Sequence, residues 1–162
     1  MNPQTLRLMP EDITAPETMA APAASPAPAF VFPVRVYYED TDAQGIVYHA
    51  NFLKFAERAR TEFMRACGRD HGDLLADHNI MLAVKRINLE FFAPARMDDM
   101  IEIHTALANC GPVTLDLRQE LKICGKNVAV VEARVVALSP DGKPQRLPPE
   151  LRQCLLAGAA AA

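Results

Sequence analysis

The sequence predicts an α+β domain in which one long helix packs against a five-stranded antiparallel sheet. Residues 51–67 carry apolar side chains at helical spacing. Residues 81–138 instead form successive apolar or alternating runs, separated by turns that contain glycine or proline. A helix with one apolar face must bury that face against the sheet, so we expect the sheet to wrap around the helix.

The first strand is expected at 31–39, where Val34 and Val36 alternate with more polar neighbours. A turn rich in carboxylates follows at 40–48. In the helix at 51–67, Asn51 is the expected N-cap and Gly68 the expected C-terminal cap. The apolar face consists of Phe52, Phe55, Ala56, Ala59, Phe63 and Ala66, and the charged residues at 54, 57, 58, 60 and 62 are expected to lie mostly off it.

The second half of the chain is expected to consist mainly of strands. The predicted elements are a short helix at 73–78, strands at 81–92, 100–108, 113–123 and 128–138, and a short C-terminal helix at 150–156. The strand at 128–138 is almost continuously apolar, which is typical of a strand inside a sheet. Antiparallel hairpins should join the last three strands.

The chain of 162 residues fits one domain. Residues 1–30 are rich in alanine and proline and predict a disordered extension, residues 31–157 the folded domain, and residues 158–162 a frayed tail. The four cysteines have no framework or metal spacing and are expected to be reduced structural thiols.

Several functional classes do not fit this composition. The net charge of -3 and the absence of a basic run argue against a nucleic-acid partner. No apolar stretch approaches the length of a membrane span, and the N-terminus lacks a signal-peptide pattern. We therefore expect a cytoplasmic protein.

The stretch YYEDTDAQGIVYHANFLKFAERARTEFM, residues 37–64, carries the candidate chemistry. Asp42 and His49 lie seven residues apart, just before a predicted helix N-terminus. Asp42 is either a turn-capping residue or a general base or nucleophile. His49 either orients water, protonates a leaving group or contacts the substrate, or is a partly buried histidine bonded to backbone. The N–H groups that begin a helix can stabilise an oxyanion.

Other polar residues have weaker functional interpretations. A structural role is favoured for Asp40, and Glu57 is more typical of a surface ion pair than of catalysis. Asp40, Asp42, His49, His71 and His78 have no tight metal-ligand spacing, so no metal is expected. Ser139 lacks the strand-turn-helix context of a hydrolase serine.

The same stretch strongly resembles the signature of hotdog-fold thioesterases of the 4-hydroxybenzoyl-CoA thioesterase class. It looks most like the YbgC type, which is associated with the Tol–Pal system, and FFAPARMDDMIEI further along the chain matches that type as well. The resemblance covers roughly residues 34–147. It implies a hotdog fold, in which a five-stranded antiparallel sheet wraps around one central helix.

The resemblance also implies roles for residues. Asp42 matches the essential carboxylate, and the backbone N–H of His49 matches the donor to the thioester oxygen, with the His49 side chain assisting. Gly45, Val47, Tyr48 and His49 are the expected substrate contacts. The resemblance further implies a homodimer or homotetramer with active sites at the subunit interface, and no cofactor.

The expected function is therefore an acyl-CoA thioesterase that releases a free acid and the CoA thiol. The loop Cys110-Gly111-Pro112 carries no basic or hydroxyl residue, so CoA-binding residues cannot be assigned from it, and thioesters of an acyl carrier protein remain an alternative substrate. Two other functions stay open. One is hydration or dehydration of an acyl thioester by the Asp42–His49 pair. The other is a non-catalytic module that binds an acyl carrier protein or an envelope-system partner.

Overall fold

The structure is a computed structural model that describes residues 30–157. In chain order the elements are β1 (Phe30–Arg35), the 3-10 helix η1 (Tyr38–Asp40), α1 (His49–Ala66), α2 (His71–His78), β2 (Met81–Phe91), β3 (Met100–Cys110), β4 (Thr114–Ile123), β5 (Lys126–Leu138) and α3 (Pro149–Ala157). The strands form one sheet in the order β1-β3-β4-β5-β2, with every neighbouring pair antiparallel. The predicted extension at 1–29 and the tail at 158–162 lie outside the described residues.

Two hairpins join β3, β4 and β5, as the sequence predicts. The turn between β4 and β5 is tight because Cys124 and Gly125 both adopt positive φ, 49° and 77°, the conformation that matches the twist of paired strands. β5 lies inside the sheet between β4 and β2, which confirms the interpretation of its apolar run. β2 is left as an edge strand.

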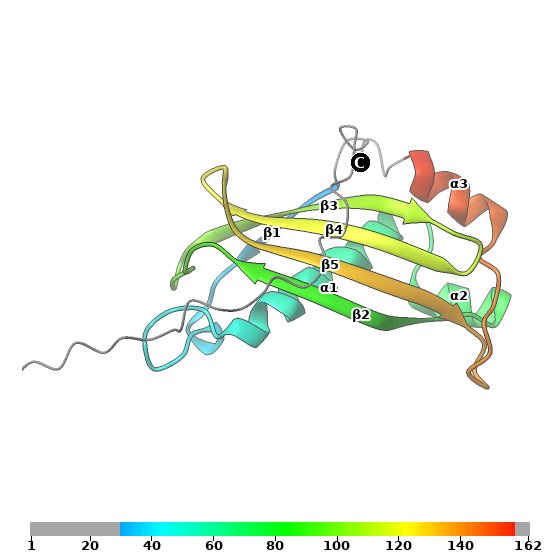
Figure 1. The fold of residues 1–162 in the computed structure, drawn as a ribbon, viewed down its shortest axis with the longest axis horizontal. Helices are drawn as coiled ribbons and strands as arrows, with labels where there is room; N and C mark the ends of the chain where they lie inside the picture. The colour runs from blue at the N-terminus through cyan, green and yellow to red at the C-terminus, as the bar shows by residue number, and fades with distance from the viewer. Residues whose placement is uncertain (1–29, 158–162) are drawn as a thin grey trace, which may run out of the picture.

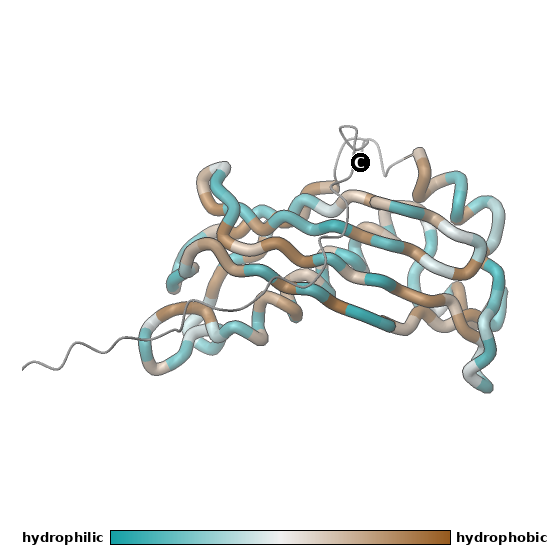
Figure 2. The backbone as a smooth tube through the Cα atoms, viewed as in Figure 1, coloured by the Kyte–Doolittle hydropathy of each residue, from teal (hydrophilic) through white to brown (hydrophobic). Residues whose placement is uncertain are grey.

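The long helix α1 lies across one face of the sheet, while α2 and α3 flank the end of the sheet where β2 begins (Figure 1). The buried residues of α1 include Phe52, Phe55, Ala59 and Phe63, which pack against inward side chains of the strands. Hydropathy alternates along the strands of Figure 2 because successive side chains point to opposite faces of the sheet. The predicted hotdog arrangement is confirmed.

The prediction for the first strand is wrong in its second half. β1 ends at Arg35, and Val36 exchanges backbone hydrogen bonds with the loop before β3: its N–H donates to the Asp99 carbonyl, and the Asp98 N–H donates to its carbonyl, both at 3.0 Å. The chain then turns through η1, where the Tyr37 N–H donates to Asp40 Oδ2 at 2.9 Å. Tyr37 and Tyr38 are consequently exposed.

The start of the central helix also differs from the prediction. α1 begins at His49 with Tyr48 at the N-cap, and Asn51 lies inside the first turn. Asn51 is buried and donates from Nδ2 to the Asp40 carbonyl at 2.9 Å, so its side chain serves the preceding turn rather than the helix end.

Candidate active site

A short hairpin before α1 holds the predicted site residues. The Asp42 N–H donates to the Ile46 carbonyl at 2.9 Å, and Thr41 pairs with Val47 in an isolated antiparallel bridge. Gly45 closes the turn with φ +74° and donates its N–H to the Asp42 carbonyl at 2.9 Å. Apart from Gly45 and its two chain neighbours, no described residue has an atom within 4 Å of the position a Cβ would take there. Gly45 therefore meets the need for a left-handed backbone and leaves open space above the turn.

The Asp42 carboxylate is half-buried and only partly engaged. Its Oδ1 accepts a hydrogen bond from the Gln44 N–H at 2.8 Å, which is the turn-capping contact that the sequence allows. Oδ2 accepts no hydrogen bond from any residue in the range 30–157. Asp42 therefore combines a structural contact through one oxygen with a second oxygen that is free to accept a proton.

Asp40 has the structural role that the sequence favours. The residue is 7% exposed. Its carboxylate accepts from the Tyr37 N–H, and its carbonyl accepts from both the Tyr48 N–H and the Asn51 side chain, each at 2.9 Å. The first bond caps η1, and the other two join η1 to the start of α1 and so fix the hairpin between them.

The first turn of α1 has no side-chain cap. Tyr48 occupies the N-cap position, where serine, threonine, aspartate or asparagine is usual, and its ring packs against that of His49 with centroids 4.3 Å apart. Within the described chain, no acceptor takes up the N–H of His49 or Ala50. Two donors at the positive end of the helix dipole thus face outward beside the hairpin of Asp42.

A second segment, residues 92–99, closes the back of this site. The Val47 N–H donates to the Ala95 carbonyl at 2.8 Å, and Ile46 pairs with Arg96. The Val47 side chain is only 4% exposed and belongs to the core. The structure therefore brings Asp42, Gly45, Tyr48 and His49 to one exposed corner, whereas the side chain of Val47 points into the protein, so any contact of Val47 with substrate is through its backbone.

Comparison with known proteins assigns this arrangement to a family. The model of the thioesterase-like superfamily matches residues 36–155. The chain belongs to this superfamily. Within the family, it is 41% identical over 122 residues to the acyl-CoA thioester hydrolase YbgC of Escherichia coli O157:H7, covering 74% of this chain and 90% of the relative.

Two further members show the same relationship. The acyl-CoA thioesterase YbgC of Haemophilus influenzae is 41% identical over 92 residues, covering 57% of this chain and 68% of that protein. The solved structure of a probable thioesterase from Bartonella henselae superposes with a TM-score of 0.72 at 29% identity, covering 74% of this chain and 99% of that one. The predicted fold, the YbgC type and the class of enzyme, a thioester hydrolase, are confirmed at the level of the family.

Neither a metal site nor a membrane span is present in the described part of the thioesterase. His, Cys, Asp and Glu of residues 30–157 form no group of three that could hold a metal ion. None of the helices in this range is both long enough and apolar enough to cross a bilayer. The expectation that the reaction needs no cofactor stays a prediction.

Sequence reasoning missed a buried polar cluster in this member of the family. Arg60 was expected off the apolar face of the helix but is 7% exposed. Its Nη1 donates to Gln119 Oε1 at 2.7 Å, and its Nη2 bonds to the carboxylate of Glu57. Gln119 is fully buried and donates from Nε2 to the Ala56 carbonyl at 2.9 Å and to Thr105 Oγ1 at 3.1 Å. Arg60 follows Ala56 by four residues and precedes Phe63 by three, so helical periodicity did place it on the buried face.

Proposed function

We propose that the domain at residues 31–157 hydrolyses an acyl-CoA thioester to the free acid and the CoA thiol. One observation carries this proposal. The half-engaged carboxylate of Asp42 and the open N–H groups of His49 and Ala50 flank one solvent-exposed corner, in the stretch whose sequence resembles the YbgC signature. Thioester hydrolysis needs a base or nucleophile and oxyanion donors together at such a point.

Each residue has a distinct task in the proposed reaction. The thioester oxygen accepts a hydrogen bond from the His49 N–H, and one donor of this kind is typically worth about 2.7–4 kcal/mol of barrier. Asp42 either takes a proton from the attacking water or attacks the carbonyl carbon itself, forming an anhydride that water then opens. The C–S bond breaks, and the leaving thiolate takes up a proton for which the His49 imidazole is a suitable donor.

We further propose that the enzyme works as a dimer formed through β2. This strand is an edge of the sheet, and it exposes Met81, Val84, Ile87 and Phe91 by 36–49%. An unpaired edge with apolar side chains is suited to pairing with a second copy about a two-fold axis. We also propose that two dimers associate into a tetramer. Similarity to the YbgC type supports the further proposal of a cytoplasmic location with a link to the Tol–Pal system.

The antiparallel geometry of such a dimer would place each active site at the interface. Within one protomer the start of α1 lies against the end of β2, where the rings of Phe52 and Phe91 are 5.5 Å apart. The later half of α1 lies against the beginning of β2, since Phe63 and Leu82 line one cleft. Two-fold pairing centred on the middle of β2 brings the end of one β2 to the beginning of the other. The N-terminal end of α1 in each copy then faces the cleft between Phe63 and Leu82 in the other copy.

The test is thiol release from a panel of short, long and aromatic acyl-CoAs by the purified wild type and the variant Asp42→Asn. Asparagine keeps an oxygen that can accept from the Gln44 N–H, so the turn should persist while the carboxylate is lost. We expect kcat/KM to fall by about 100-fold or more, the usual contribution of a positioned acid or base. The control is Asp141→Asn, an exposed carboxylate in the turn after β5, which should leave the rate unchanged.

Two results would contradict the proposal. Near-normal turnover of the best substrate by Asp42→Asn would remove the carboxylate from the mechanism. Loss of enoyl absorbance without thiol release, measured on the same panel with enoyl-CoAs added, would instead indicate a hydratase.

A further inference from the structure

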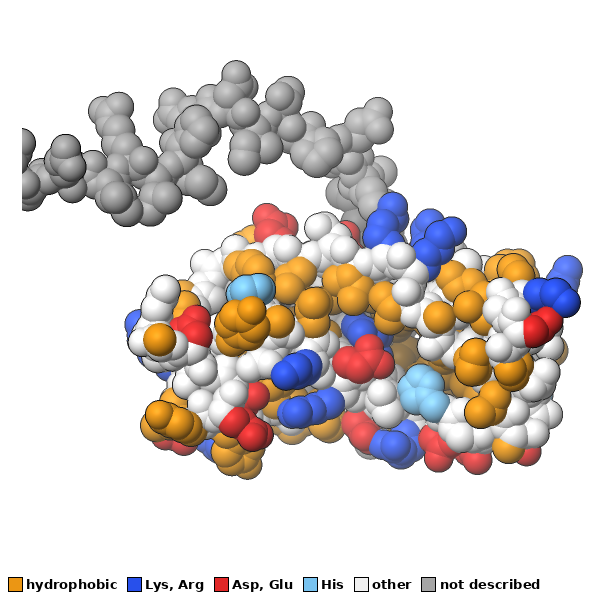
Figure 3. Space-filling view, turned by 90° about the horizontal axis from the view of Figure 1, so that it is seen from below, with side chains coloured by type: hydrophobic (Ala, Val, Ile, Leu, Met, Phe, Trp, Pro, Cys, Tyr) orange, Lys and Arg blue, Asp and Glu red, His pale blue; other side chains and the backbone are white. Residues whose placement is uncertain are grey.

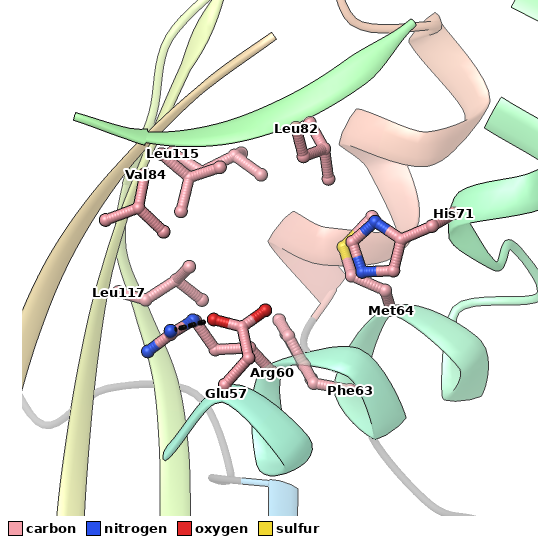
Figure 4. Close-up of a pocket in the computed structure, with 10 residues that line it drawn as sticks. Glu57, Arg60, Phe63, Met64, His71, Leu82, Val84, Leu115 and Leu117 are labelled. Carbon is pink, nitrogen blue, oxygen red and sulfur yellow. Dashed lines mark hydrogen bonds and ion pairs between the residues drawn. The ribbon is translucent and has the colours of Figure 1, made fainter. Parts of the chain in front are cut away.

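The C-terminal helix α3 packs on the end of α1 through two leucines. Leu151 and Leu155 are each 1% exposed and share a core cluster with Phe63 and Met64 of α1. Phe63 and Met64 also border the cleft opposite Leu82, and the salmon ribbon of α3 passes behind them in Figure 4. This cleft is open to solvent on the face that carries α1, which is hollowed in Figure 3. Because a hollow offers no atoms to pack against, the end of α1 depends on α3 for part of its cover.

Two cysteines meet where α3 covers the end of α1. Cys67 follows the last residue of α1 and packs against the same core cluster, and Cys154 lies in α3 between the two buried leucines. A second contact brings the two segments together, since Arg69 Nη2 lies 3.8 Å from Oε1 of Glu150, one helical turn before Cys154. Burial, together with a hydrogen bond to the thiol of Cys154, raises the pKa of Cys67 to about 12. Two neighbouring contacts thus hold the thiols of Cys67 and Cys154 side by side.

This pair differs from the other two cysteines. All four thiols are free. The Sγ of Cys110 donates to the Gly111 carbonyl at 3.9 Å, and Cys124 is exposed in the turn between β4 and β5. Cys67 and Cys154 are half-buried, and exposed residues precede each of them in the chain. A small molecule can therefore reach a pair of thiols that are already in contact.

We propose that Cys67 and Cys154 are a site of reversible disulfide formation, which fastens α3 to the end of α1. The oxidant is a small-molecule disulfide such as oxidised glutathione. The Cys154 thiolate attacks one sulfur of the oxidant and expels the other as a thiolate, and the Cys67 thiolate then attacks the Cys154 sulfur and expels the second. Two protein thiols are oxidised, the small disulfide is reduced to two thiols, and these take up the two protons. A dithiol reverses both exchanges.

The order of attack follows from the acidity of the thiols. Only a thiolate attacks a disulfide, and the raised pKa of Cys67 makes its thiolate scarce near neutral pH. Cys154 therefore reacts first with the oxidant, and Cys67 closes the link from its position beside it. The rate of closure should rise as the pH is raised from 7 to 9.

The link would stabilise the domain without touching the candidate active site. It closes a loop of 87 positions in the unfolded chain, and a cross-link stabilises more when the loop is long. The nine residues of α3 are too few for a helix that is stable in isolation, so its docking is what the link secures. His49 lies at the other end of the 18-residue helix α1, about 27 Å away. The inference does not depend on the proposed hydrolysis.

Peptide mapping tests whether the link forms. The full chain with Cys124→Ser, which prevents cross-links through that exposed thiol, is incubated with oxidised glutathione at pH 8, alkylated and digested with trypsin. Cleavage after arginine and lysine leaves the other three cysteines on separate peptides. We expect peptide 66–69 joined to the peptide that begins at residue 153, and its loss after treatment with dithiothreitol. A link to Cys110 instead, glutathione left on Cys154, or no linked peptide would overturn the inference.

Thermal unfolding of the same protein measures what the link does. The Tm of the oxidised form should exceed that of the reduced form by about 5 °C or more. Cys67→Ser should abolish both the linked peptide and the rise in Tm, whereas the matched control Cys110→Ser, whose thiol packs against the same cluster, should keep both. Circular dichroism establishes that the variants are folded, and Cys154→Ser replaces Cys67→Ser if that variant is not. An unchanged Tm in the linked protein, or a rise that survives without Cys67, would refute the fastening of α3.

Discussion

Gln119→Met is expected to lower the free energy of unfolding by about 2–4 kcal/mol. The substitution keeps an unbranched side chain in a fully buried position but removes the oxygen that accepts from Arg60 Nη1 at 2.7 Å. A hydrogen bond to a charged group contributes about 1.5–3 kcal/mol, and a buried donor that loses its acceptor adds to the cost. The Thr105 hydroxyl also loses the bond from Gln119 Nε2.

The double variant Arg60→Met/Gln119→Met provides the sharper test. Arg60→Met alone leaves the Gln119 oxygen unsatisfied, whereas Gln119→Met alone leaves a buried cation with one partner fewer. Once both residues are apolar, neither defect remains, and such replacements of a buried polar pair are often close to neutral. We therefore expect the double variant to be more stable than the sum of the single effects predicts, by about 1–3 kcal/mol.

The assay is urea unfolding followed by circular dichroism, with linear extrapolation to water. The protomer concentration must be the same for all four proteins, because the stability of the proposed dimer would depend on it. Additivity of the two single effects to within about 0.5 kcal/mol would mean that Arg60 and Gln119 are not coupled. The buried bond between Arg60 and Gln119 would then contribute nothing measurable to stability.

Three further predictions concern separate parts of the chain. Gly45→Ala should lower the free energy of unfolding by about 1–2 kcal/mol through backbone strain alone, and Gly45→Asn by less; equal costs in urea unfolding would contradict this. Burial and a neighbouring thiol raise the pKa of Cys67 to about 12. Iodoacetamide at pH 8 should therefore alkylate the exposed Cys124 faster than Cys67, as followed by mass spectrometry. Faster alkylation of Cys67 would contradict this prediction. The hydrogen bond from Arg134 holds the pKa of Asp116 below its ordinary value of 3.8. The stabilisation that ionised Asp116 provides is therefore fully present above pH 3.8 and is lost as the pH falls through its lowered pKa. The difference in the free energy of unfolding between wild type and Asp116→Asn should shrink over that range of pH. A difference that stays constant from pH 6 to pH 2 would refute this prediction.

Local patterns predicted the later strands well because each element carries its own period. The alternation in β3 and β4 fixed both strands to within two residues, and the turns between them followed from glycine and proline. The end of β1 and the start of α1 were misplaced because distant groups decide them. Val36 bonds to Asp98 and Asp99 rather than continuing a strand, and Asn51 bonds to the Asp40 carbonyl. Asp98 and Asp99 lie far along the chain from Val36, and Asp40 lies 11 residues before Asn51, outside the single turn that decides a helix cap.

The turn of Asp42 and the buried cluster of Arg60 and Gln119 differ in the same way. The turn at Asp42 and Gly45 could be predicted because both of its features are local. Gly45 adopts a positive φ, and the Asp42 carboxylate accepts from the N–H of Gln44, two residues further along the chain. The buried cluster depends on the hydrogen bond from Arg60 to Gln119, which lies 59 positions further along the chain. A signal was present all the same. Gln119 is an inward-facing polar residue between Leu117 and Leu121 in β4, and an inward polar residue in one element calls for a polar partner in the element packed on it.

The hairpin of Asp42 and the buried cluster of Arg60 and Gln119 are held in place by separate sets of bonds. The hairpin of Asp42 is held by backbone bonds and by Asp40, none of which involves the cleft. The buried cluster is held by Gln119 and Thr105 on the sheet, which have no bond to the hairpin. Under the proposed mechanism a change at Asp42 should therefore lower the rate with every substrate. Gln119→Met should instead lower the free energy of unfolding, because it removes bonds of the buried cluster and none of the hairpin.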